Sequence, residues 1–165
     1  MSFLRKLFGG KENDKSYKFV ERQGKVTQTD RSFDAWTSGD LNEMLKATKT
    51  DTNPIDRHFL LQTIVAETYK RRKEKKYRDL CIEYSEKHIE EFKNRIEKPL
   101  KADSYGQLPR ISTFQHYATL LTELGDYDKA IEVCKTAVSY DLDDGTKSGY
   151  EGRIERIEKK RNSNS

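Results

Sequence analysis

The chain has 165 residues, of which 32 are basic and 28 acidic, so that charged side chains make up 36% of it and the formal net charge is +4. Leu, Ile, Val and Phe form only about a fifth of the residues, which predicts a lean core and excludes two large domains. No apolar stretch approaches the roughly 18 to 20 residues needed to cross a bilayer, and no secretory signal pattern is visible, so we expect a cytoplasmic protein.

Residues 1–32 are polar and poorly patterned, and we expect a flexible or weakly structured arm there. An apolar stripe within residues 1–8 fits peripheral contact with a membrane, a short helix docked on protein, or disorder. Gln23 and Gly24, between apolar residues, predict a small hairpin over about 19–26.

A short helix is expected over about 39–48, because Thr37 followed by Asp40 resembles a capping box. Phe33 and Trp36 lie just before this helix and are expected to pack back on the main body, since large aromatic side chains bury much apolar area.

The next two helices are expected at about 54–72 and 75–97, forming an antiparallel hairpin. Asn53 and Pro54 form a strong helix start, because Asn caps well and Pro fits the first helical position. The second helix is expected to stop before Pro99, and the segment from Pro99 to Pro109 reads as a loop.

Three more helices follow from the apolar spacing, at about 111–124, 127–140 and 146–161. Gly125 breaks the first of them from the second. We therefore predict an all-α fold, with a helical domain over 33–161 and a disordered tail at 162–165.

One segment of the chain resembles a tetratricopeptide repeat (TPR). Phe114 and Ala118 occupy the bulky and small positions of its first helix, the turn is at 125–127, and Ala130 and Ala137 are the small positions of its second helix. Two positions depart from the repeat pattern, Cys134 in place of an aromatic residue and Leu142 in place of a proline. The resemblance implies one clear repeat at about 111–144, a degenerate repeat at about 54–98, and a C-terminal capping helix. The alternative is an ordinary helical bundle with a chance match.

If the resemblance transfers, the first helices present a face that binds a peptide or helix of another protein, as a non-catalytic adaptor or scaffold does. The candidate partner-binding residues are Thr63, Glu67, Lys70, Arg71, Gln115, His116, Thr119, Thr122 and Glu123. The alternative for each of them is a solvated helix face.

Residues 70–78 hold seven positive side chains in nine positions, at the turn of the first helical hairpin. The candidate anion-binding residues are Arg71, Arg72, Lys73, Lys75, Lys76 and Arg78. This cluster supports a second hypothesis, binding to an anionic surface or to nucleic acid, against the simpler interpretation of a solvated turn. The second repeat is rich in acidic residues, so self-association of basic and acidic ends is a further hypothesis.

The sequence contains no recognisable catalytic motif and no metal-ligand spacing, so we expect no enzyme activity, no metal and no cofactor. Cys81 and His88 are seven residues apart on one helix, too far to share a zinc ion without other ligands, and we expect both to pack in the core, with Cys81 and Cys134 as reduced thiols. A pocket in which two ionisable groups converge would instead indicate an enzyme.

Overall fold

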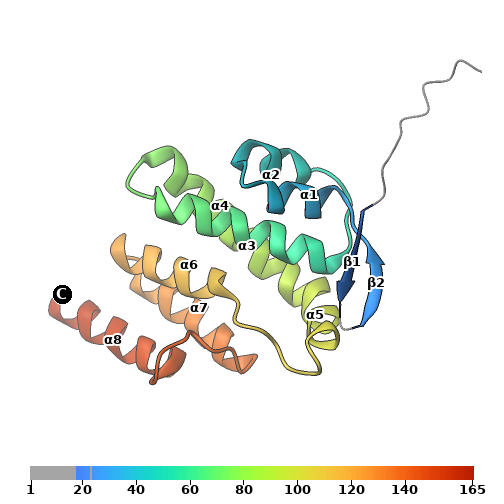
Figure 1. Cartoon of the computed structure of the whole chain (residues 1–165). Helices are drawn as coiled ribbons and strands as arrows, with labels where there is room; N and C mark the ends of the chain where they lie inside the picture. The colour runs from blue at the N-terminus through green and yellow to red at the C-terminus, as the bar shows by residue number, and fades with distance from the viewer. Residues whose placement is uncertain (1–17, 23) are drawn as a thin grey trace, which may run out of the picture.

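The chain is built mainly from helices, as the sequence pattern predicts, with one small β-hairpin (Figure 1). The computed structural model describes residues 18–22 and 24–165, so the apolar stripe within residues 1–8 lies outside the described residues. The elements in chain order are β1 (Phe19–Arg22), β2 (Lys25–Gln28), α1 (Arg31–Ser38), α2 (Leu41–Ala47), α3 (Pro54–Lys70), α4 (Lys75–Glu91), the π-helical turn η1 (Phe92–Ile96), α5 (Glu97–Asp103), α6 (Ser112–Glu123), α7 (Tyr127–Ser139) and α8 (Gly149–Ser163).

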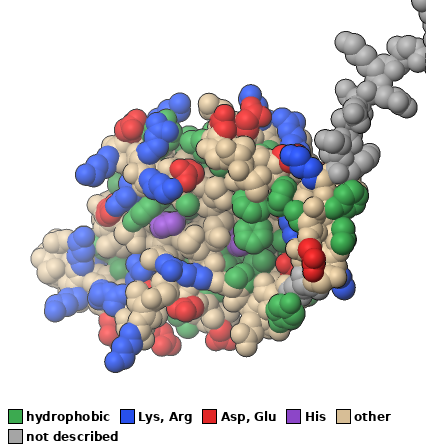
Figure 2. All heavy atoms as spheres, viewed as in Figure 1, with side chains coloured by type: hydrophobic (Ala, Val, Ile, Leu, Met, Phe, Trp, Pro, Cys, Tyr) green, Lys and Arg blue, Asp and Glu red, His purple; other side chains and the backbone are tan. Residues whose placement is uncertain are grey.

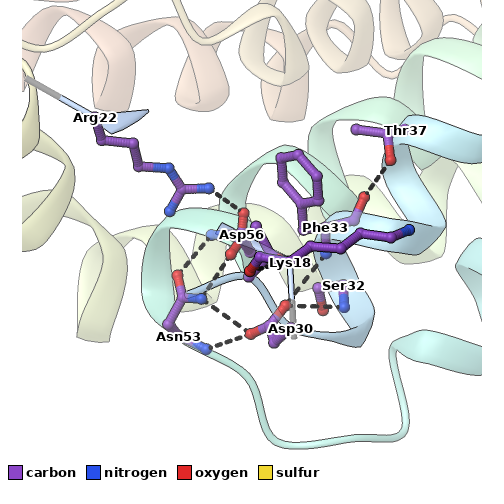
Figure 3. A network of polar contacts seen from close by, with 9 residues as sticks. Lys18, Arg22, Asp30, Ser32, Phe33, Thr37, Asn53 and Asp56 are labelled. Carbon is purple, nitrogen blue, oxygen red and sulfur yellow. Dashed lines mark hydrogen bonds and ion pairs between the residues drawn. The ribbon is translucent and has the colours of Figure 1, made fainter. Parts of the chain in front are cut away.

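The predicted hairpin is confirmed, and a polar network fixes it to the helical body. Its strands pair antiparallel from Phe19 opposite Gln28 to Arg22 opposite Lys25. Arg22 forms an ion pair with Asp56 of α3, whose carboxylate is fully buried. Figure 3 shows Asp56 beside Asn53. The side-chain amide of Asn53 donates to the carboxylate of Asp30 (2.9 Å), a residue that lies between the hairpin and α1 in the chain. Four polar residues thus connect the hairpin, α1 and α3.

Helix α1 is absent from the sequence prediction, which began the helical domain at residue 33 and placed Phe33 and Trp36 ahead of the first helix. Asp30 caps α1 by accepting hydrogen bonds from the backbone N–H groups of Ser32 (2.9 Å) and Phe33 (3.2 Å). Gly39 ends the helix in the left-handed conformation, at φ 74°. The expected packing of Trp36 on the body is confirmed by its contact with Phe59, at 5.2 Å between ring centroids.

The predicted helix over 39–48 is confirmed as α2, but the proposed capping box is wrong. Asp40 is itself the cap, since its side chain accepts from the backbone N–H groups of Asn42 and Glu43. Thr37 lies within α1, where its hydroxyl donates to the Phe33 carbonyl.

Helices α3 and α4 form the first predicted hairpin, and α3 begins at Pro54 with Asn53 as its cap, as expected. The predicted stop before Pro99 is wrong, because the chain stays helical through η1 and α5 as far as Asp103. Pro99 is the third residue of α5, directly after the π-helical turn η1. Burial explains the continuation: Phe92, Ile96 and Leu100, spaced four residues apart, are almost completely buried.

Helices α6 and α7 form the second hairpin, joined at Gly125, which has φ 80° and therefore suits only a residue that tolerates the left-handed region. Helix α8 packs on α7 through Tyr150 and Ile157, both buried. It begins later than predicted and extends to Ser163, into the segment expected to be a disordered tail. Asn164 follows it and donates to the Tyr127 hydroxyl of α7 (2.7 Å).

The core consists of two apolar clusters, one among α1 to α4 and one among the end of α4, η1, α5, α6, α7 and α8. Leu120 of α6 lies in the first cluster, whereas the rest of the buried face of α6 lies in the second. Helix α6 therefore joins the two hairpins, and α3 and α6 lie next to each other along the molecule (Figure 1).

Candidate functional site

The residues predicted to bind a partner lie on α3 and α6, apart from Arg71, which follows α3. Three of them are threonines that donate to the carbonyl four residues earlier: Thr63 to Phe59 (2.7 Å), Thr119 to Gln115 (2.8 Å) and Thr122 to Ala118 (2.7 Å). These half-buried hydroxyl groups donate their hydrogen within their own helix. Their oxygens can therefore act only as hydrogen-bond acceptors towards a bound partner.

The structure brings α3 and α6 together at a junction of aromatic and charged groups. Tyr69 of α3 stacks on His116 of α6, with ring centroids 4.4 Å apart. Arg72 lies over the Tyr69 ring, 4.0 Å from its centroid. The same guanidinium donates two hydrogen bonds of 2.8 Å to the Glu123 carboxylate. These bonds lower the pKa of Glu123. Glu67 forms an ion pair with Lys70 on the same helix, so neither predicted carboxylate is unpaired.

His116 lies in a positive environment. Burial lowers the pKa of its imidazole, and the nearby cations Arg110, Arg72, Lys70 and Arg153 lower it further. Gln115, on the same helix, accepts a hydrogen bond from Arg110. Figure 2, in the same view as Figure 1, shows Lys and Arg side chains around a histidine on this side of the molecule.

Helix α8 closes one side of the α6 face and leaves a groove of about 320 Å³. The groove is lined by Thr119, Thr122, Glu123, Arg153, Arg156, Ile157 and Lys160. Arg153 is fixed at the α6 side: its guanidinium contacts the buried Asp144 carboxylate (3.1 and 3.0 Å) and donates to the Thr119 hydroxyl (3.1 Å). Burial alone would raise the pKa of Asp144, but hydrogen bonds from Thr146 and Arg153 lower it. We call this feature the α6–α8 groove.

The α8 side of this groove is not among the residues predicted from the sequence. Arg153, Arg156 and Lys160 recur at intervals of three and four residues, which places them on one side of a helix. That spacing was the available signal, but only the packing of α8 shows which neighbour this side faces.

The predicted anion-binding cluster at 70–78 is partly neutralised. Arg72 and Lys75 pair with Glu123 and Asp79, and Arg71 lies 4.0 Å from Glu74 and 3.4 Å from the ring centroid of Tyr77. Lys73, Lys76 and Arg78 complete the predicted set, and Lys76 lies 5.6 Å from the Tyr77 ring centroid. Intramolecular partners therefore occupy a large part of the charge that the sequence presents.

A second groove, of about 250 Å³, lies between α4 and α7 and brings three ionisable groups together. The Tyr117 hydroxyl donates to Glu86 (2.6 Å), which also forms an ion pair with Lys129. Burial and Glu86 raise the pKa of Tyr117 to about 12, whereas Lys129 and Tyr117 lower the pKa of Glu86, and Glu86 raises that of Lys129. Each group is therefore held more firmly in its usual charge state, which suits a structural ion pair rather than proton transfer near neutral pH.

His58 of α3, His88 of α4 and Thr113 of α6 form a buried chain of polar contacts. His58 Nδ1 lies 3.0 Å from His88 Nε2, and His88 Nδ1 lies 2.7 Å from the Thr113 hydroxyl. The expected core position of His88 is confirmed, and Cys81 and Cys134 are buried free thiols. Among residues 18–22 and 24–165, no group of three or more His, Cys, Asp or Glu side chains is placed to hold a metal ion.

None of the helices within the described ranges has the length and apolar character needed to traverse a bilayer. Comparison of the chain with protein-family models, with curated proteins and with solved structures finds no match.

Proposed function

We propose that this protein is a non-catalytic interaction module, related in design to TPR proteins, that binds a peptide or helix of another protein on the face formed by α3, α6 and α8. The observation that carries the proposal is the α6–α8 groove, which lies on the same side of α6 as the predicted partner-binding threonines Thr119 and Thr122. Concave surfaces lined by successive helices are the usual binding surfaces of helical repeats.

The repeat interpretation has local support. Ala118 and Ala130, the small residues expected where two repeat helices meet, are both completely buried. Gly125 and Asp126 supply the turn and the cap of the next helix. Small side chains let two helices approach closely, and α8 then takes the place of the capping helix.

Binding through the basic cluster at 70–78 is the second candidate, for an anionic surface or nucleic acid. Lys73, Lys76 and Arg78 favour it, because the described chain places no carboxylate in an ion pair with them. We rank it below the groove, since Glu123 and Asp79 already pair with two other members of the cluster.

The test fills the groove without changing its charge. Thr122→Tyr adds a bulky neutral side chain to the groove, and Thr136→Tyr on α7 is the matched control, because Thr136 also donates to the carbonyl four residues earlier and lines the α4–α7 groove instead. Purified tagged protein is used to capture partners from cells that express it, with quantitative mass spectrometry, after circular dichroism has shown that both variants fold.

We expect one set of partners to be retained by the wild type and Thr136→Tyr and lost by Thr122→Tyr. Partners that bind all three proteins equally would contradict the proposed face. Partners lost only when Lys73 and Lys76 are changed to Glu would favour the basic cluster instead.

A further inference from the structure

The α6–α8 groove has an excess of positive charge. Its lining contains three cations, Arg153, Arg156 and Lys160, and one carboxylate, Glu123. That carboxylate already makes two hydrogen bonds to Arg72. Within the described chain, no ion pair joins Arg156 or Lys160 to a carboxylate, and both side chains are exposed. Arg156 donates to the Ser148 hydroxyl (3.0 Å) and Lys160 lies in the field of Glu123, but neither forms an ion pair within the described chain, so both are available to a bound partner.

Arg153 is organised in advance for such a partner. Its contacts with Asp144 and Thr119 fix the plane of the guanidinium, and its side chain remains 16% exposed. A guanidinium has five N–H donors, so donors are left over after these contacts. Because the side chain is already ordered, little additional rotamer entropy is lost when a carboxylate binds.

Beyond the groove, Arg72 and Lys70 are paired with Glu123 and Glu67, whereas Arg110 forms no ion pair within the described chain and adds positive charge. His116 lies on α6 one turn before Thr119. Burial lowers the pKa of its imidazole, and the charges of Arg110, Arg72, Lys70 and Arg153 lower this pKa further. A field of one sign along a concave surface attracts segments of the opposite sign and raises their rate of association.

The chain's own arm does not have the complementary charge. Residues 1–17 contain four basic and two acidic side chains, so this segment is itself positive. The volume of about 320 Å³ lies at the low end for ligand pockets and admits a few side chains rather than a folded domain. An extended acidic segment from another protein satisfies both conditions.

We propose that the α6–α8 groove binds an acidic segment of a partner protein, whose Asp or Glu carboxylates contact Arg153, Arg156 and Lys160. This inference rests on the proposed function, and it adds the chemistry by which the partner is recognised. Thr119 and Thr122 line the opposite wall and can accept hydrogen bonds from the backbone N–H groups of the same segment.

The experiment uses the full chain and a fluorescein-labelled peptide of eight alternating Glu and Asp residues, with the corresponding Gln and Asn peptide as the uncharged probe. Binding is measured by fluorescence anisotropy at low and at physiological salt. The variants are Arg156→Glu and Lys160→Glu. The control is Lys159→Glu, an equal charge change at an exposed residue of the same helix that does not line the groove.

We expect the acidic peptide to bind and the uncharged peptide not to bind, with weaker binding at higher salt. Each groove variant should weaken binding about tenfold, in the range expected for loss of a charge-assisted contact, and Lys159→Glu should weaken it by less than about twofold. Equal weakening by all three variants would indicate attraction to overall charge and would overturn the site. Absence of binding by the acidic peptide would overturn the inference as well.

Two further arms separate this inference from its alternatives. Loss of captured partners in Thr122→Tyr, together with no effect of Lys160→Glu on either partners or peptide, would preserve the proposed face and reject acidic recognition. A labelled single-stranded DNA of 20 nucleotides that binds more tightly than the peptide, and loses binding when Lys73 and Lys76 become Glu, would assign the electrostatic role to the cluster at 70–78.

Discussion

Acidification should destabilise this protein through its buried histidine pair. His58 and His88 are completely buried, and both nitrogens of His88 lie within hydrogen-bonding distance of a partner, whereas His58 Nε2 is buried without one. We assign His58 Nδ1–H as the donor to His88, and His88 Nδ1–H as the donor to Thr113. This assignment leaves a lone pair rather than an N–H unpaired at the buried His58 Nε2, which costs less free energy. A second proton on either ring would place an uncompensated charge in the core.

The size of the effect follows from the pKa of His58. Burial lowers this pKa from 6.5 to about 4. Because the folded pKa is below the unfolded one, the unfolded chain binds more protons in this interval, so the histidine's contribution to stability is complete above pH 6.5 and is lost as the pH falls towards 4. His58 alone should therefore remove about 2 kcal/mol of unfolding free energy between pH 7 and pH 5. Burial also lowers the pKa of His88 well below its ordinary value, which adds a loss of the same sign.

The measurement is urea unfolding followed by circular dichroism at 222 nm, at pH 7 and pH 5. The wild type should lose at least about 2 kcal/mol. His58→Asn should lose less, because one of the two buried titrating rings is gone, and the double variant with His88→Asn should lose least. His116→Gln compares the third histidine: burial lowers the pKa of this half-buried ring as well, so its removal should also reduce the loss, but by less than His58→Asn does.

Between pH 7 and pH 5, histidine is the main side chain that titrates. Carboxylates ordinarily titrate below pH 5. Hydrogen bonds from Lys129 and Arg72 hold the pKa values of Glu86 and Glu123 lower still, and hydrogen bonds from Thr146 and Arg153 do the same for Asp144. Equal stability of the wild type at the two pH values would refute the argument. So would a loss in the double variant as large as in the wild type.

Three further predictions concern packing and backbone. Ala118→Leu should cost about 1 to 3 kcal/mol in urea unfolding, because the completely buried Ala118 has no room for a larger side chain, and an unchanged midpoint would show that α6 and α7 do not meet closely there. Gly125→Ala should cost about 1 kcal/mol and lower the melting temperature, since a Cβ meets no atom within 4 Å and only the left-handed backbone opposes it; no change would mean that the turn relaxes freely. Cys81 and Cys134 should react with a thiol reagent only after unfolding, because burial raises the pKa of both thiols, that of Cys134 to about 11; rapid labelling of the native protein would contradict their burial.

The sequence predicts the helices whose signals are local. Asn53 and Pro54 start α3, and Gly125 separates α6 from α7, because caps and turns depend on a few adjacent residues. Helix α1 was missed although Asp30 and Gly39 mark its ends. Its eight residues are largely polar, and its apolar contacts, made by Ala35 and Trp36, are with residues distant in sequence such as Phe59.

The candidate site shows the same division. The α3 and α6 residues could be selected from the repeat-like pattern, but the cations of α8 could not be assigned to a face. Tyr150 and Ile157 fix the rotation of α8 against α7, and only this packing turns Arg156 and Lys160 towards α6. The neutralisation of Arg72 by Glu123, 51 residues away, depends on the contact of α3 with α6 in the same way.

Buried ion pairs give this lean core its specific arrangement. Arg57 of α3 pairs with Glu91 at the end of α4 (2.7 Å) and donates to the Thr48 carbonyl after α2, so one guanidinium fixes three helices relative to one another. Such pairs add little net stability compared with apolar packing, but an arrangement that left the charge unpaired would be strongly disfavoured. Arg153 and Asp144 form another such ion pair beside the α6–α8 groove. The pair that orients the groove's arginine also restricts where α8 can lie, so the binding surface and the fold depend on the same contact.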